Sequence, residues 1–208
     1  EVAFFSKTNF KIESGHIFEN FKIAYKSFGE INDNKSNVIL VCHALTGDQF
    51  VAGKNPITNK NGWWDRMVGP NKPIDTNKYF VICSNVLGGC VGSTGPKEIN
   101  LITNSPFGTS FPSITIRDMV KAQKYLINAL NIEKLFAVVG GSMGAMQVLQ
   151  WTIDYPEKIM NAVHIAGALK HSAQNIAFHE VGRQAIMNDP SWNNGNYAAE
   201  DIKPERGL

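Results

Sequence analysis

A serine set between glycines, where an apolar run gives way to a helical pattern, constrains this chain more than any other feature. Residues 135–139 are apolar enough for a buried strand, and residues 147–151 favour a helix. Between them, Gly140, Ser142 and Gly144 have the G-x-S-x-G spacing of a nucleophile elbow, in the strand-turn-helix context that the pattern requires. The stretch therefore predicts a strand that ends in a sharp turn and presents Ser142.

The tight turn explains why glycine is needed on both sides of the serine. Side chains two residues before and after Ser142 would collide as strand and helix pass each other, and Gly140 and Gly144 remove that collision. The turn strains the serine backbone and lifts its hydroxyl clear of the sheet, while the first N–H groups of the helix face any oxyanion that forms beside it. The alternative is an ordinary glycine-rich turn with a solvent-facing serine, since the bare pattern is weak in a chain with 18 glycines.

Composition describes an ordinary globular protein. The 208 residues are 43% hydrophobic, which is enough to bury a core, and the length favours one domain or one domain with part of another. The net charge of +2 comes from dispersed lysines, which argues against nucleic acid or a membrane surface as a partner. No stretch approaches the ~18 apolar residues of a transmembrane helix, and the N-terminus lacks a signal-peptide pattern. We expect a soluble protein.

Cysteine and histidine give no metal pattern. The odd number of cysteines, with Cys42 and Cys83 in apolar strand-like runs, fits free thiols in a reducing cytoplasm. The five histidines form no ligand spacing with nearby acids, so no metal is assigned. Cys90 lacks a helix N-terminus or basic neighbour that would favour its thiolate, and we expect it to be structural.

The order of elements predicts a mostly parallel sheet with crossover helices. Alternating apolar residues around residues 10–12 and 21–25, with a turn at Ser14 and Gly15, favour an antiparallel hairpin at the start. Thr115 and Asp118 match a capping box. Further strands are expected at residues 38–42, 79–83, 135–139 and 160–166, and helices at about 115–130, 143–155 and 173–189.

Two loops follow central strands at the edge where open α/β sheets bind ligands. Residues 43–47 form the first, which could face the turn at Ser142. Residues 85–96 form the second, which is rich in glycine but lacks the G-x-G-x-x-G and Gly-Lys-Ser/Thr patterns of nucleotide-binding loops. Adjacent tryptophans at Trp63 and Trp64 cover a core more often than they line a pocket.

Six short motifs are spread over the whole chain. They are His-Ala-Leu-Thr-Gly at 43–47, Gly-Trp-Trp at 62–64, Ser-Asn-Val-Leu-Gly-Gly-Cys at 84–90, Gly-Ser-Thr-Gly-Pro at 92–96, Gly-Gly-Ser-Met-Gly at 140–144 and Asp-Tyr-Pro at 154–156. In order and spacing they resemble the homoserine O-acetyltransferases of methionine biosynthesis. The resemblance implies an α/β-hydrolase fold, with a mostly parallel sheet and an N-terminal antiparallel hairpin.

The resemblance also implies acyl transfer by double displacement. Ser142 would take the acetyl group from acetyl-CoA while the backbone N–H groups of Leu45 and Met143 hold the oxyanion, and the hydroxyl of L-homoserine would then accept the acetyl group. Acetyl-CoA would be a co-substrate, with no bound cofactor. A homodimer is what the resemblance suggests.

The end of the chain departs from the family pattern. A triad acid and histidine follow the serine late in the sequence in this fold, whereas His164, His171 and His179 all lie close to the elbow and are not favoured as the base. We expect the triad Asp and His, most of a helical lid and the arginine for the substrate carboxylate to lie beyond Leu208. For Arg183, an ion pair on a helix face is favoured over a substrate contact.

The domain expectation follows from this departure. Residues 1–185 would form the N-terminal part of the hydrolase core, and residues 186–208 would begin the lid. The chain opens on Glu1 rather than methionine and ends without a closing element, so it resembles part of a longer protein. Without a base, the 208 residues alone should be inactive or nearly so.

Three other functions stay open. A homoserine O-succinyltransferase shares the scaffold and differs in the acyl group carried by CoA. An esterase would use water as the acceptor. A non-enzymatic binding protein on a degenerate hydrolase scaffold is the third, although an unused elbow has no reason to keep a strained serine.

Overall fold

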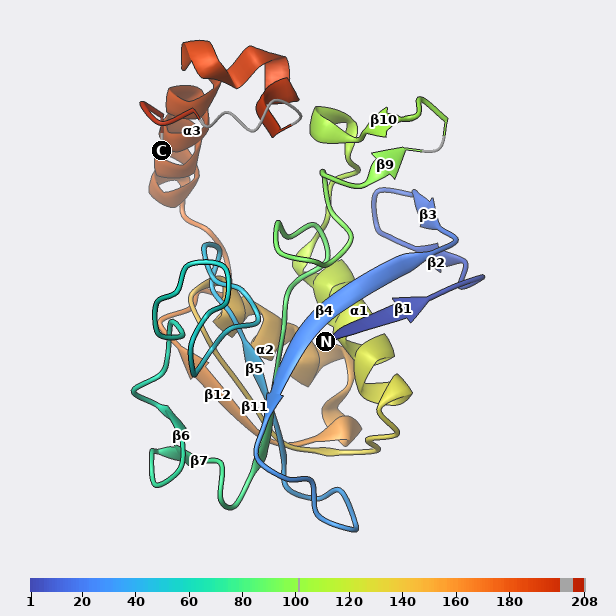
Figure 1. Ribbon diagram of the computed structural model, residues 1–208, viewed down its shortest axis with the longest axis vertical. Helices are drawn as coiled ribbons and strands as arrows, with labels where there is room; N and C mark the ends of the chain where they lie inside the picture. The colour runs from blue at the N-terminus through green and yellow to red at the C-terminus, as the bar shows by residue number, and fades with distance from the viewer. Residues whose placement is uncertain (101, 199–203, 208) are drawn as a thin grey trace. The chain divides into compact units, whose positions relative to one another are not determined.

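A computed structural model describes residues 1–100, 102–198 and 204–207, drawn in Figure 1. The chain divides into two compact units. One comprises Glu1–Thr94 and Ser113–Ala168, and the other comprises Gly95–Pro112 and Leu169–Leu208. The expected boundary between a core at residues 1–185 and a lid at residues 186–208 stays a prediction.

The first unit contains a six-stranded sheet in the order β1-β4-β8-β5-β11-β12. Strands β8, β5, β11 and β12 are mutually parallel, and β4 runs antiparallel to β1 and β8. This confirms the predicted fold class, a mostly parallel sheet with antiparallel strands at its N-terminal side. The bounds are β1 Val2–Phe5, β4 Phe21–Phe28, β5 Val38–Cys42, β8 Phe80–Ser84, β11 Leu135–Gly141 and β12 Ile159–Ile165.

Two helices of this unit pack against each other, α1 (Ile116–Ala129) and α2 (Met143–Asp154), and α2 also packs on β5, β11 and β12. The predicted capping box starts α1: the Thr115 hydroxyl accepts the Asp118 N–H at 3.2 Å, and the Asp118 carboxylate accepts the Thr115 N–H at 3.0 Å. Short elements complete the unit, namely β2 Phe10–Lys11, β3 Ile17–Phe18, β6 Val68–Gly69, β7 Ile74–Asp75 and the 3-10 helix η2 Pro156–Lys158.

The second unit contains α3 (Ala173–Met187), which begins after Ser172, whose side chain accepts the N–H of Asn175 at 3.2 Å. Its other elements are β9 Ile99–Asn100, β10 Ser105–Pro106 and the 3-10 helices η1 Gly108–Ser110 and η3 Pro190–Ala198. Within the residues that the structure describes, no helix combines the length and the apolar character needed to cross a membrane.

The central strand β5 is buried along its whole length, as its continuous apolar sequence predicts. On one face of the sheet, Ile39 and Val41 pack in a cluster with Val51, Val68 and other apolar residues of the segment that follows β5. On the other face lie α1 and α2 (Figure 1). Cover on both faces holds the carboxyl ends of β5 and β11 in fixed register.

The start of the chain differs from the predicted hairpin. The segment at β2 pairs with β3 through a turn at Gly15, and β4 pairs instead with β1, a strand that the sequence analysis missed. Phe5 of β1 stacks on Phe21 of β4 at 4.8 Å between ring centroids, and both rings contact Tyr125 of α1. Burial of this aromatic cluster accounts for the observed pairing.

Strand β12 lies at the edge of the sheet and is exposed along nearly its whole length. Its apolar side chains include Met160 (58% exposed), Val163 (43%) and Ile165 (40%). An exposed apolar edge strand offers unpaired backbone groups and apolar surface to a further strand.

The cap of α1 provides a test of the local structure. Thr115→Ala removes the acceptor for the Asp118 N–H and should lower the free energy of unfolding by about 1 kcal/mol in urea denaturation. Thr115→Ser keeps the hydroxyl and should stay within about 0.5 kcal/mol of the parent protein. Equal losses in both variants would show that the hydroxyl does not cap the helix.

Candidate functional site

The turn between β11 and α2 holds Ser142 in a strained backbone conformation. Its φ is 57° and its ψ is −121°, a combination that residues with a Cβ seldom adopt. The Ser142 side chain is exposed, and α2 begins at the next residue, Met143. A strained serine therefore stands at the carboxyl edge of the sheet, in front of a helix N-terminus.

Two glycines let the strand and the helix approach closely. A Cβ on Gly144 would overlap the carbonyl oxygen of Cys42, and a Cβ on Gly140 would lie 2.5 Å from the carbonyl of Gly144. These neighbours are backbone atoms, so no side-chain movement would relieve either clash. Gly141 is different, because a Cβ there would meet nothing closer than 3.8 Å.

The close approach brings the loop after β5 beside the elbow. Gly140 and Cys42 are register partners on neighbouring parallel strands, so the chain leaves both strands at the same edge of the sheet. A Cβ on Gly144 would also lie 3.1 Å from the carbonyl oxygen of His43. Residues 43–47 thus begin against the first turn of α2.

The buried imidazole of His43 shapes this loop. Its Nδ1 lies 2.7 Å from the carbonyl oxygen of Ala44, and its Nε2 accepts the N–H of Val86 at 3.2 Å. The Ala44 carbonyl also accepts the Gly47 N–H at 2.9 Å. Because Val86 donates to Nε2, the proton is assigned to Nδ1, which donates to Ala44.

These bonds orient the N–H of Leu45. The Ala44 carbonyl and the Leu45 N–H belong to one planar trans peptide, in which the two groups point in opposite directions. The Leu45 N–H therefore points away from the His43 ring. Met143 is the first residue of α2, so its N–H has no partner within the helix. Among the described residues, neither N–H has a hydrogen-bond acceptor.

The environment keeps His43 neutral. Burial lowers the pKa of His43, against smaller opposing effects from its bond to the Ala44 carbonyl and from the charge of Asp48. Both ring nitrogens are occupied by backbone partners. His43 is therefore a support for the loop rather than a base for Ser142.

The other histidines considered above lie in different places. His164 is exposed on β12 as the register partner of Gly140, whereas His171 and His179 belong to the second unit, where their rings stack at 5.2 Å. Among the described residues, no side chain hydrogen-bonds to Ser142, and no three His, Cys, Asp or Glu side chains gather as metal ligands. Arg183 forms the expected ion pair on its helix, with Glu180 at 3.0 Å.

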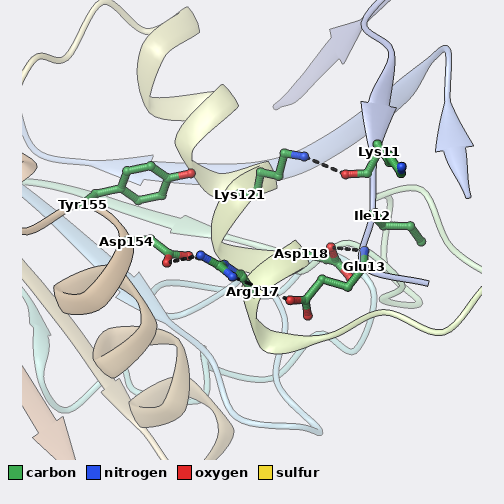
Figure 2. A pocket seen from close by; sticks show the side chains of 8 residues that line it. All are labelled: Lys11, Ile12, Glu13, Arg117, Asp118, Lys121, Asp154 and Tyr155. Atoms are coloured by element: carbon green, nitrogen blue, oxygen red, sulfur yellow. Dashed lines mark hydrogen bonds and ion pairs between the residues drawn. The ribbon is translucent and has the colours of Figure 1, made fainter. Parts of the chain in front are cut away.

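A pocket of about 520 Å³ lies near the opposite end of α2 (Figure 2). Arg117 donates to both carboxylate oxygens of Asp154, at 3.0 and 2.9 Å, Asp118 accepts the backbone N–H of Glu13 at 3.0 Å, and Lys121 donates to the backbone carbonyl of Lys11 at 2.6 Å. These bonds join α1, α2 and the segment that contains β2. The lining residues are Lys11, Ile12, Glu13, Arg117, Asp118, Lys121, Asp154 and Tyr155.

A family model described as the alpha/beta hydrolase fold matches residues 37–206. The chain belongs to the α/β hydrolase fold family. In this family member, the elbow at Ser142 and the loop at residues 43–47 form the candidate active site.

The chain is also similar to individual relatives. It is 60% identical over 198 residues to a homoserine O-acetyltransferase of Caulobacter vibrioides, a match that covers 95% of this chain and 52% of that protein. The crystal structure of homoserine O-acetyltransferase from Bacillus anthracis aligns with a TM-score of 0.88 at 33% identity, over 100% of this chain and 57% of that one. The crystal structure of esterase E22 aligns with a TM-score of 0.85 at 38% identity, and the alignment covers 100% of this chain and 58% of the esterase chain. The chain spans about half the length of the curated relatives it matches.

Sequence reasoning missed two polar supports of the site, the His43 ring and the buried side chain of Gln147. A signal for the second exists in the sequence, because Gln147 interrupts an otherwise apolar helix face that includes Val148 and Trp151. The His43 ring bonds only backbone groups, and Gln147 bonds the His43 carbonyl as well as the Gln123 side chain. The positions of these partners depend on the tertiary fold.

The glycine contacts predict a sharp difference between two alanine variants. Gly144→Ala should lower the free energy of unfolding by more than about 2 kcal/mol, because its Cβ meets backbone atoms that cannot yield. Gly141→Ala, three residues earlier, should change it by less than about 0.5 kcal/mol. Urea denaturation of the two variants measures this difference, and similar values would contradict the close approach of α2 to β5.

The lowered pKa of His43 predicts a loss of stability in mild acid. The unfolded chain takes up the His43 proton more readily than the folded protein as the pH falls below the ordinary value of 6.5. The His43 contribution to stability is therefore complete above that pH and declines below it.

Denaturant titrations at about pH 7 and pH 5 test this pH dependence. His43→Asn, whose amide still offers a donor to Ala44, should lose less stability between the two pH values than the parent protein. A pH dependence that survives in His43→Asn would assign the effect to another group.

Proposed function

We propose that the complete protein transfers an acetyl group from acetyl-CoA to the side-chain hydroxyl of L-homoserine, through an acyl-Ser142 intermediate. The observation that carries the proposal is the strained, exposed Ser142 beside a loop whose Leu45 N–H is unpaired among the described residues. The similarity to homoserine O-acetyltransferases supports the choice of donor and acceptor. The same similarity implies a role in methionine biosynthesis.

The first half-reaction would transfer the acetyl group from acetyl-CoA to Ser142. The Ser142 oxygen attacks the thioester carbonyl as a base removes its proton, and the carbonyl oxygen becomes an oxyanion between the N–H groups of Leu45 and Met143. Collapse of this intermediate breaks the carbon–sulfur bond and releases CoA as its thiol, with the proton returned to sulfur. Each oxyanion donor is typically worth ~3 kcal/mol in the transition state, and the N-terminus of α2 adds a favourable dipole.

The second half-reaction would transfer the acetyl group from Ser142 to homoserine. The homoserine hydroxyl gives its proton to the base and attacks the acyl-enzyme carbonyl, and the same two N–H groups hold the second oxyanion. Ser142 leaves as its hydroxyl after taking the proton back. O-acetylhomoserine is the product.

The base itself is part of the proposal. We place the triad Asp and His, most of the lid and the arginine for the substrate carboxylate in sequence beyond residue 208, and we expect the 208 residues alone to transfer little acetyl. The exposed apolar edge of β12 supports this, since further strands would pair there, as does the coverage of about half of each relative. A homodimer is proposed on the family resemblance alone, and a cytoplasmic location on the free thiols of Cys42 and Cys83.

Ester hydrolysis is the second candidate. It is favoured by the esterase structure, which at 38% identity is closer in sequence than the Bacillus anthracis acetyltransferase at 33%. The same acyl-Ser142 would form, and water would replace homoserine in the second step.

Mass spectrometry of the complete protein separates these functions. Acetyl-CoA should leave an acetyl adduct on Ser142 that homoserine discharges faster than water, and Ser142→Ala should form none. A succinyl adduct from succinyl-CoA instead would name the other acyl donor, and discharge at the same rate with or without homoserine would name the esterase. Absence of any adduct on Ser142 would contradict the acetyltransferase, the succinyltransferase and the esterase alike, and would favour a binding protein.

A further inference from the structure

A line of buried hydrogen bonds runs beneath the candidate site. The Trp151 indole N–H donates to Oε1 of Gln123 at 2.8 Å, and the Gln123 amide donates to Oε1 of Gln147 at 2.7 Å. All three side chains are at most 1% exposed. The line joins α1 to α2 and ends on the Gln147 carboxamide.

The amide nitrogen of Gln147 forms hydrogen bonds with the loop after β5 and with the first residue of α2. Its Nε2 donates hydrogen bonds to the carbonyl oxygen of His43 at 3.3 Å and to the carbonyl oxygen of Met143 at 3.4 Å. His43 begins the loop that carries the Leu45 N–H, and Met143 begins the helix that carries the other unpaired N–H. Because Gln147 belongs to α2 itself, its bond to the His43 carbonyl ties this helix to the loop that carries the Leu45 N–H.

Stability alone does not call for this arrangement. Three polar side chains in an apolar interior must each be desolvated, and hydrogen bonds among them return only about the cost of that desolvation. Apolar side chains of the same volume would fill the space without that cost. What the polar line provides instead is direction, because each bond fixes the rotamer of the next amide along it.

We propose that Gln147 is a positioning residue, whose carboxamide sets the relative placement of the Leu45 and Met143 N–H groups. The inference rests on the proposed function and deepens it. The His43 ring orients the Leu45 peptide within its loop, and Gln147 fixes that loop against the elbow helix. Gln123 and Trp151 hold the Gln147 side chain from behind.

The consequence is a loss confined to the chemical step. Oxyanion donors bind charge that develops only in the transition state, so misplacing them lowers kcat and leaves substrate binding nearly unchanged. Removing one such donor typically costs about 10²–10³ in kcat, and a displacement of the donors should cost part of that.

The test uses the complete protein with acetyl-CoA and homoserine. Gln147→Met keeps the volume and removes the donor, and it should lower kcat by about 10–10² while each KM changes by less than about threefold. Gln150→Met makes the same substitution one turn later on α2, at a side chain that bonds Asp154, and should leave kcat within about twofold. A folded Gln147→Met protein with parental kcat would overturn the proposal.

A second variant covers the case in which Gln147→Met does not fold. Gln147→Asn keeps a carboxamide in the buried position but is one methylene shorter, so its amide no longer reaches the His43 carbonyl and kcat should fall with unchanged KM as well. Parental kcat in that variant would overturn the proposal equally.

A readout that does not depend on the natural substrates separates this inference from the proposed function. A fluorophosphonate forms a tetrahedral adduct with an activated serine, and its rate of attachment to Ser142 should fall in Gln147→Met as kcat does. If the parent protein is labelled but transfers no acetyl group, the proposed function fails, and slower labelling of the variant still supports the positioning role. Equal labelling rates in parent and variant would overturn the positioning role alone.

Discussion

The close approach of the first turn of α2 to the end of β5 is the constraint on which the site depends. Gly144 lies against the carbonyls of Cys42 and His43, and any side chain there would push the helix away from the strand. That contact fixes where the serine stands and where the loop after β5 begins. The strain at Ser142, with φ at 57°, is held by the sheet on one side and the helix on the other.

Around this contact the chain builds two kinds of support. Apolar packing on both faces of the sheet holds β5 and β11 in register, which brings their following loops to the same edge. Buried polar groups then set finer positions: the neutral His43 ring fixes one peptide of the loop, and the Gln147 carboxamide ties that loop to the helix. In the proposed reaction, these supports would preorganise a place for an oxyanion, so that little rearrangement would be needed.

Much of this could be predicted from the sequence, because the signals are local. The elbow, the apolar strands β5 and β11 and the cap at Thr115 each depend on residues within one turn or strand. Strand β1 escaped notice because its pairing depends on Phe21, far away in the sequence, and on Tyr125 of α1. The roles of His43 and Gln147 could not be predicted from the sequence, because both side chains bond backbone carbonyls. Every residue carries a carbonyl, and only the fold determines which one lies within reach.

The central claim is that an oxyanion on the Ser142 adduct lies between two backbone N–H groups. A crystal structure of the complete protein with a phosphonate on Ser142 tests it most directly. The account predicts one phosphonyl oxygen within about 2.7–3.1 Å of both the Leu45 and the Met143 nitrogens. A phosphonyl oxygen that points to solvent, or toward donors other than these two, would contradict it.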